Sequence, residues 1–145
     1  MAITRYATAH WQGDLKSGKG TLATPASGLL ADTPYGFNSR FGDVKGTNPE
    51  ELIAGAHAAC YAMALSNDLA SAGHTPDSVD ATARVQLRNV DGAPTIAEID
   101  LDVVGVVPGL DEAGFQEAAE QAKVNCPVSR ALASVPTINL TARLG

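Results

Sequence analysis

The chain has 145 residues, of which 45% are hydrophobic and 18% are charged, and its formal net charge is −6. This length predicts a single domain, residues 1–145, that can bury a hydrophobic core. The acidic balance, with no cluster of Lys and Arg, argues against nucleic acid as a partner, because DNA and RNA are polyanions.

The N-terminus and the most hydrophobic run of the chain predict a cytoplasmic protein. Residues 1–6 lack the charged-then-apolar pattern of a signal peptide. The most hydrophobic stretch, residues 52–65, is shorter than the roughly 20 residues that a membrane-spanning helix needs. We therefore expect no membrane partner. In a reducing compartment, paired cysteines more often serve catalysis, redox chemistry or metal binding than structural stabilisation.

Three short strands are expected before residue 45. Residues 3–11 alternate loosely between apolar and polar side chains, and residues 20–24 form a returning strand after a turn rich in Gly and Lys. A loop with two prolines follows, and Phe37–Phe41 is expected as the third strand.

A long helix is predicted to begin at Asn48, with Pro49 as its first residue and Glu51 completing a capping box. A cap at Thr47, paired with Glu50, is the alternative start. The helix is expected to reach about residue 72, before a glycine and a proline. Because residues 52–65 are apolar or small on every side, we expect a buried helix, under a sheet or at a subunit interface.

The second half of the chain predicts a hairpin, two helices and a last strand. Residues 81–90 and 95–107 flank an Asp91-Gly92 turn, and the second arm alternates as in a sheet with one solvated face. Asp111 is expected to cap a helix, a short helix is expected over residues 128–134, and residues 137–144 form the final strand. The resulting order, β-β-β-α-β-β-α-β, predicts an α+β fold with antiparallel sheets around central helices.

Two cysteines, Cys60 and Cys126, stand 66 positions apart (126 − 60), so only the fold can bring them together. Cys60 lies within the small-residue helix, where a cysteine can simply fill space. No Lys or Arg of that helix is available to stabilise its thiolate, so an activating charge must come from elsewhere. Cys126 precedes Pro127 at a predicted helix N-cap, with Arg130 nearby, and local physics therefore ranks Cys126 as the more acidic thiol.

The two cysteine motifs resemble those of the osmotically inducible OsmC/Ohr family of thiol peroxidases, and the OsmC branch most closely. The likeness extends over essentially the whole chain. The motifs that carry it are Gly46–Leu52, Ala56–Cys60 and Cys126–Ser129, supported by Ala9–Asp14, Pro34–Phe41 and Gly73–Pro76.

This resemblance implies an enzyme that reduces organic hydroperoxides, and hydrogen peroxide less efficiently, at the expense of a dithiol reductant and without a metal or other cofactor. It implies Cys60 as the peroxidatic cysteine and Cys126 as the resolving one. It further implies that Arg40 and Glu50 activate the thiolate and orient the peroxide. The resemblance also implies an intertwined homodimer with two active sites at the subunit interface.

Glu50 and Cys60 cannot touch within one straight helix, because ten residues span about 15 Å along its axis. Either the helix bends near Gly55 or a second subunit supplies Glu50. We expect the site to be completed across the dimer interface.

Two other classes of protein remain open from the residues. One is a ligand-binding or structural stress protein whose cysteines are inert. The other is a metal-dependent enzyme that uses His57, Cys60 and Cys126, since His57 and Cys60 share a helix face at a chelating spacing.

Overall fold

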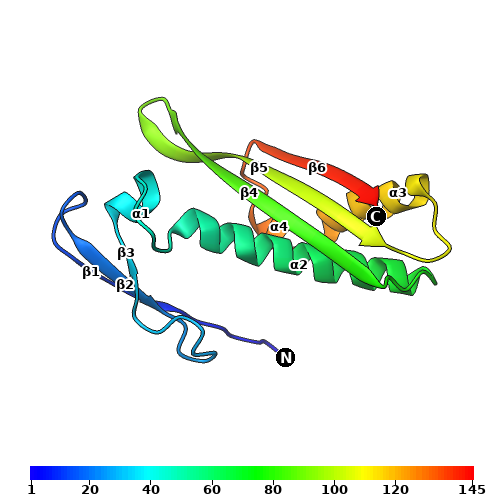
Figure 1. Ribbon diagram of the computed structural model, residues 1–145, viewed down its shortest axis with the longest axis horizontal. Helices are drawn as coiled ribbons and strands as arrows, with labels where there is room; N and C mark the ends of the chain where they lie inside the picture. Colours follow the sequence, from blue (N-terminus) through cyan, green and yellow to red (C-terminus); the bar gives the residue numbers. More distant parts are fainter. The chain divides into compact units, whose positions relative to one another are not determined.

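A computed structural model describes residues 1–145 as two compact units, Met1–Leu52 and Ile53–Gly145 (Figure 1). The long helix α2 (Pro49–Ser71) begins at the end of the first unit and continues into the second. The class is α+β, as the sequence predicts, with two three-stranded sheets and four helices.

The first unit is a small antiparallel sheet with almost no buried interior. Its strands are β1 (Thr8–Gln12), β2 (Lys19–Ala23) and β3 (Thr33–Tyr35), in the order β1-β2-β3. Gly20 is the one buried residue of this unit. Three short strands without a buried apolar face are marginally stable on their own.

The prediction of a strand over residues 37–41 was wrong, because this segment is the short helix α1 (Phe37–Phe41). Phe37 and Phe41 are four residues apart, and their ring centroids lie 4.9 Å apart on one side of the helical turn. Ser39 Oγ accepts a hydrogen bond from the Gly36 N–H at 3.0 Å, which stabilises the start of the helical turn. The third strand lies just before, at β3.

Helix α2 begins as predicted. Asn48 Oδ1 accepts a hydrogen bond from the Glu51 N–H at 2.9 Å, and Pro49 is the first helical residue. Gly73, with a φ of +90°, follows the end of the helix, where a left-handed residue is the common stop signal.

Only one face of α2 is buried within this chain. His57, Tyr61, Leu65 and Leu69 follow one another at intervals of four and are nearly inaccessible to solvent. In contrast, 75% of Met63 is exposed. The expectation of a helix buried on all sides therefore does not hold for a single chain, and an apolar face remains uncovered.

The second unit is built on a mixed sheet, with the order β4-β5-β6. Strands β4 (Ser78–Val90) and β5 (Ala93–Val106) form the predicted hairpin, with Asp91 and Gly92 at positive φ in its turn. Strand β6 (Thr137–Leu144) pairs with β5 in parallel, so the expectation of purely antiparallel sheets was wrong at this pair. The reason is topological, since two helices carry the chain back before β6 begins.

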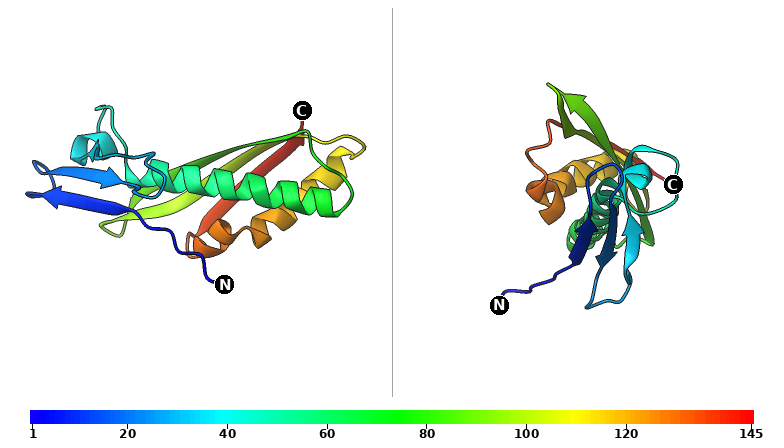
Figure 2. Two further views of the ribbon diagram at one scale, coloured as in Figure 1. Left: turned by 90° about the horizontal axis from the view of Figure 1, so that it is seen from below. Right: turned by 90° about the vertical axis from the view of Figure 1, so that its left-hand side faces the viewer.

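Those two helices are α3 (Glu112–Asn125) and α4 (Pro127–Ala131). Asp111 Oδ1 accepts from the Gly114 N–H at 2.8 Å, as expected of an N-cap, and α4 is shorter than the predicted 128–134. The second part of α2 and α3 lie on one face of the sheet (Figure 2). All of the buried hydrophobic residues lie in this unit: Tyr61, Leu65, Leu69, Ile99, Leu101, Val103, Val107, Phe115, Ala119, Ala122 and Cys126.

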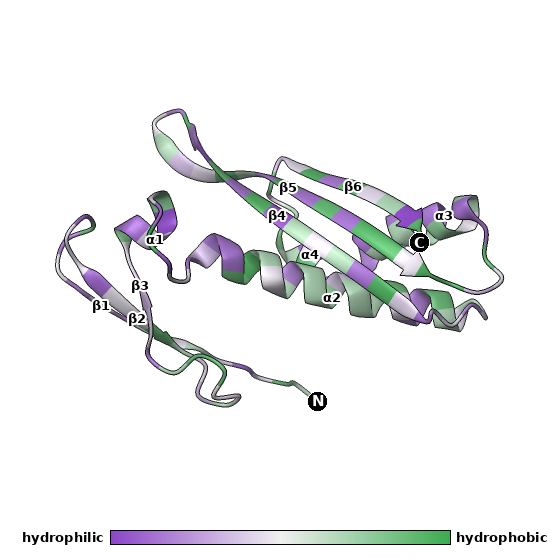
Figure 3. Cartoon of the chain, in the orientation of Figure 1, coloured by the Kyte–Doolittle hydropathy of each residue, from purple (hydrophilic) through white to green (hydrophobic).

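The other face of the sheet is polar, as the alternation along β5 predicts, and hydrophilic and hydrophobic bands follow one another along the strand in Figure 3. Arg84 pairs with Asp102 and Arg88 with Glu98 across β4 and β5. Asn139 of β6 donates to Asp100 at 2.8 Å.

Gly105 of β5 allows the ring of Phe115 to pack directly on the sheet. A Cβ at this position would lie well inside van der Waals contact with the ring, which is fully buried. We expect Gly105→Ala to lower the free energy of unfolding by about 2 kcal/mol, as overpacking of a core usually does, measured by urea denaturation. In a double-mutant cycle with Phe115→Leu, strictly additive losses would contradict the contact.

Candidate active site

The four residues that the sequence singles out form two separate pairs. Cys60 and Cys126 are both in the second unit, and Arg40 and Glu50 are both in the first. Each pair has its own geometry.

The two cysteines are free thiols whose side chains meet. Cys60 lies on α2 and is half-buried, and Cys126 lies fully buried at the junction where α3 ends and α4 begins. The proximity of the two sulfurs raises the pKa of Cys60 and lowers that of Cys126. The fold therefore joins two positions 66 residues apart into one dithiol.

The environment makes Cys126 the more acidic of the two. Burial raises the pKa of Cys126, but hydrogen bonds from the N–H and hydroxyl of Ser129, from Cys60 and from the Val128 N–H outweigh it and lower its pKa. Burial is also the main cause that raises the pKa of Cys60, and the contact with Cys126 adds to it. This order agrees with the ranking from local helix physics.

A buried hydrogen bond joins α2, which carries Cys60, to α4, which follows Cys126. His57 Nε2 and Ser129 Oγ are 2.8 Å apart, and the two residues are 0% and 5% exposed. Burial lowers the pKa of His57, which keeps the ring neutral. From the sequence, His57 was expected to pack in the interior or support the site, with metal ligation as the less favoured alternative, and Ser129 had no expected role. The signal that was available is a histidine one turn from Cys60 in a helix of small residues.

Arg40 and Glu50 form a two-pronged ion pair. Arg40 Nε lies 3.1 Å from each oxygen of the Glu50 carboxylate, and an η nitrogen lies 2.5 Å from Oε1. Because Glu50 accepts hydrogen bonds from one side of the guanidinium, the pKa of Arg40 is raised and the orientation of the charged group is fixed. The guanidinium carbon lies 5.1 Å from the ring centroid of Phe41.

An apolar hollow of about 300 Å³ opens beside Arg40. Arg40 is its one charged side chain, and the rest of the wall is aromatic or aliphatic. The other lining residues are Trp11, Leu15, Tyr35, Gly36, Phe37, Phe41 and Pro49.

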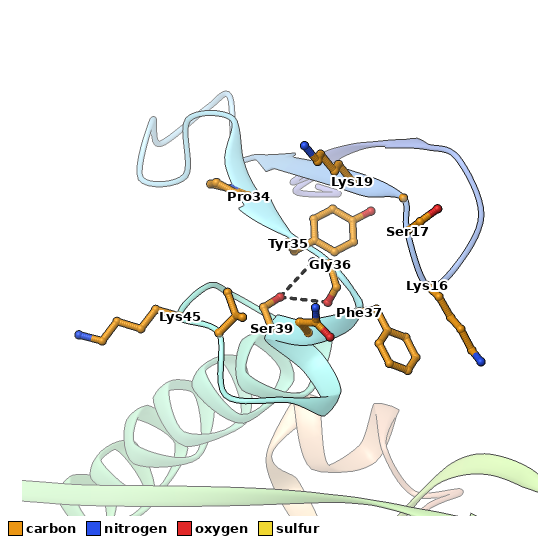
Figure 4. A pocket seen from close by; sticks show the side chains of 12 residues that line it. Lys16, Ser17, Lys19, Pro34, Tyr35, Gly36, Phe37, Ser39 and Lys45 are labelled. Atoms are coloured by element: carbon orange, nitrogen blue, oxygen red, sulfur yellow. Dashed lines mark hydrogen bonds between the residues drawn. The ribbon is translucent and has the colours of Figure 1, made fainter.

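A neighbouring hollow of about 450 Å³ has a more polar wall (Figure 4). Ser39 bonds to both the N–H and the carbonyl of Gly36 in its wall. The side chains of Lys16, Lys19 and Lys45 extend in different directions and do not converge on one point (Figure 4). This hollow therefore offers no focused charge to a ligand.

No group of three or more His, Cys, Asp and Glu side chains is placed to hold a metal ion. His57 Nε2 is engaged with Ser129 Oγ. The hypothesis of a metal enzyme based on His57, Cys60 and Cys126 has no ligand set in this fold. None of the helices is long and apolar enough to cross a lipid bilayer.

Residues 42–141 match the family model described as OsmC-like protein. The chain is 50% identical to the Peroxiredoxin OsmC of Escherichia coli (strain K12) over 139 residues, or 96% of each chain. It is also 29% identical over 127 residues to the Organic hydroperoxide resistance protein of Xanthomonas axonopodis pv. citri, covering 87% of this chain and 86% of that protein. The chain belongs to the OsmC-like family.

Solved structures agree with this assignment. The organic hydroperoxide resistance protein OhrB of Bacillus subtilis superposes with a TM-score of 0.70 at 26% identity, covering 97% of this chain and 98% of that one. An organic hydroperoxide resistance protein from Elizabethkingia anophelis gives a TM-score of 0.74 at 24% identity over the full length of both chains, a likeness of fold alone.

Proposed function

We propose that this protein is a thiol-dependent peroxidase that reduces organic hydroperoxides, and hydrogen peroxide less efficiently, to alcohols and water. The observation that carries the proposal is the contact between two free thiols, Cys60 and Cys126, in a member of the OsmC-like family. Relatives named as a peroxiredoxin and as organic hydroperoxide resistance proteins support the same activity.

The proposed reaction begins at Cys60. Its thiolate attacks the terminal peroxide oxygen, the O–O bond breaks, and a proton is taken up by the departing alkoxide to give the alcohol. Cys60 is left as a sulfenic acid. The sulfur of Cys126 then attacks the sulfenic sulfur, water leaves, and a disulfide forms. An external dithiol returns both cysteines to the reduced state by exchange.

Cys60 needs a cation for this reaction, because its surroundings within the second unit raise its pKa. We assign this role to Arg40, whose guanidinium would stabilise the thiolate and the negative charge that develops on the peroxide oxygens. Glu50 fixes the orientation of the Arg40 guanidinium through the two-pronged ion pair. The apolar hollow beside Arg40 would receive the organic group of the substrate and favour it over a small polar peroxide.

A second copy of the chain is proposed to complete each site. Helix α2 runs without interruption from Pro49 to Ser71, so its rise alone separates Glu50 from Cys60 by about 15 Å. The first unit has no apolar core, and α2 leaves an apolar face exposed around Met63, as expected of surfaces that a homodimer covers. Residues 1–145 would then act as one OsmC-like domain, intertwined with its partner.

The reduced dithiol also suits a cytoplasmic location, where thiols are kept free and dithiol reductants are at hand. No metal or organic cofactor enters the proposed cycle.

Thiol counting during a single turnover tests this function. We expect one equivalent of an organic hydroperoxide, such as cumene hydroperoxide, to convert both thiols of each chain into a Cys60–Cys126 disulfide, with one equivalent of alcohol formed. Mass spectrometry of the alkylated protein and its peptides measures both quantities. Thiols that stay free in excess peroxide would refute the peroxidase and favour a ligand-binding stress protein instead.

A further inference from the structure

A chain of buried polar groups leads from the interior of the second unit to the sulfur of Cys126. His57 on α2 lies 2.8 Å from the hydroxyl of Ser129 on α4, and Cys126 is fully inaccessible to solvent. Buried polar groups are costly unless they are paired, so a serine and a histidine placed behind a buried thiol require a reason.

Ser129 is placed to act on Cys126 by its position in α4. Cys126 is the N-cap of this helix, and Ser129 is its third residue, the position whose N–H faces the cap side chain. The Cys126 side chain makes no capping hydrogen bond in the resting chain, and the N–H and hydroxyl of Ser129 are the neighbouring groups that stabilise its charged form. Both contacts lower the pKa of Cys126.

The neutral ring of His57 sets the direction of the hydroxyl. Its Nδ1 has no hydrogen-bond partner, and a buried N–H without a partner is rarer than an unused acceptor. The favoured tautomer therefore carries its hydrogen on Nε2 and donates to Ser129 Oγ. The hydroxyl hydrogen of Ser129 is then free to point at the Cys126 sulfur.

We propose that Ser129, oriented by His57, donates a hydrogen bond to Cys126 Sγ and holds it as the thiolate that resolves the sulfenic acid on Cys60. The proposal rests on the peroxidase function stated above. In this step the Cys126 S–H proton is released, the S–S bond forms, and the S–O bond of the sulfenic acid breaks. The departing hydroxide takes up a proton to become water. Ser129 touches the reacting sulfur, and His57 is a positioning residue that acts through it.

Other ionisable groups near Cys126 do not replace this contact. Cys60 donates to the same sulfur in the resting dithiol, but as a sulfenic acid it becomes the electrophile. The hydroxyl of Tyr61 donates to the Ala119 carbonyl at 2.8 Å, and burial together with Glu120 and Cys126 raises the pKa of Tyr61. Ser129 is thus the side-chain donor that remains for the Cys126 thiolate during resolution.

The first test titrates Cys126 alone, in a Cys60→Ser background, by the ultraviolet absorbance of its thiolate. A hydrogen bond to a charged group corresponds to about one pH unit, so Ser129→Ala should raise the pKa of Cys126 by about one unit. His57→Leu should raise it similarly, and His57→Gln, which keeps an N–H donor, should restore it. Ser134→Ala, an exposed serine five residues on, is the matched control and should leave it unchanged.

The second test follows the resolving step in chains that keep both cysteines. The sulfenic acid on Cys60 is trapped with dimedone at increasing times after one equivalent of hydroperoxide. Below the pKa of Cys126, a rise of one unit leaves tenfold less thiolate, so Ser129→Ala should lower the ratio of resolution rate to peroxide-reduction rate by up to about tenfold. His57→Gln should restore the ratio.

The two proposals fail in different ways. An unchanged pKa of Cys126 in folded Ser129→Ala would overturn the role of Ser129, whatever the peroxidase activity. A raised pKa in a protein that consumes no peroxide would refute the peroxidase while supporting the hydrogen bond. If His57→Leu does not fold, by circular dichroism, His57→Gln and Ser129→Ala still decide the question.

Discussion

Replacing Cys60 by serine is expected to reduce hydroperoxide consumption on the order of a thousandfold or more, since a serine hydroxyl is not ionised near neutral pH. Replacing Cys126 by serine should instead preserve one turnover per chain, because the first step uses Cys60 alone. The Cys126→Ser protein should accumulate sulfenic acid and, in excess peroxide, the sulfinic acid. Coupled peroxide assays and mass spectrometry of the Cys60 peptide distinguish the two variants.

The contrast between these variants decides which thiol reacts first. In the resting chain, Cys126 has the lowered pKa and Cys60 the raised one, so acidity alone would select Cys126 as the attacking thiol. If Cys60→Ser retained a first turnover and Cys126→Ser lost it, the proposed roles would be reversed. Both variants fill nearly the same volume as the parent chain, and unfolding curves provide the control for stability.

Replacing Arg40 by alanine is expected to lower kcat/KM for an organic hydroperoxide by about a hundredfold to a thousandfold, the usual effect of losing one donor to a developing oxyanion. Arg40→Lys should recover little, because a lysine cannot form the two-pronged pair with Glu50. Arg84→Ala is the matched control. Arg84 also pairs with a carboxylate, Asp102, but on the exposed polar face of the sheet, so its loss should leave kcat/KM unchanged.

Mixed dimers test which subunit supplies Arg40. An Arg40→Ala chain paired with a Cys60→Ser chain contains one intact site if Arg40 acts across the interface, and none if it acts within its own chain. Differently tagged chains, co-expressed and purified as heterodimers, should therefore show about half of the parent activity. Heterodimers that are no more active than the Arg40→Ala homodimer would refute a shared site. A chain that remains monomeric at all concentrations would also refute it.

The Arg40–Glu50 pair could be predicted from the sequence, whereas the His57–Ser129 hydrogen bond could not. Arg40 and Glu50 are identified by family motifs, and their pairing is a short-range event within the first unit. The bond between His57 and Ser129 joins positions 72 apart, on different helices, and no local pattern encodes it. From the sequence alone, His57 could be recognised only as a histidine in an apolar helix and Ser129 only as a serine that follows Cys126.

The elements of the fold were predictable where local chemistry is strong. The cap at Asn48, the Asp91-Gly92 turn and the cap at Asp111 each depend on a side chain or a backbone angle that a few residues specify. Phe37–Phe41 was misassigned because, in a segment of five residues, apolar side chains four positions apart fit one face of a strand as well as one face of a helix. The parallel pairing of β6 with β5 depends on where α3 and α4 carry the chain, which no alternation pattern contains.

The sequence by itself determined the α+β class, the family and the two cysteines, because motif spacing, caps and hydrophobic periodicity are local properties of the chain. The tertiary structure alone decided that Cys60 and Cys126 meet as one dithiol. Local helix physics ranks Cys126 as the more acidic thiol, and the tertiary structure adds its burial and the contact with Cys60, which depend on α2, α3 and α4 packing together. The acidity of a thiol depends on its surroundings, and for Cys126 these combine near neighbours, Val128 and Ser129, with Cys60, which is distant in sequence.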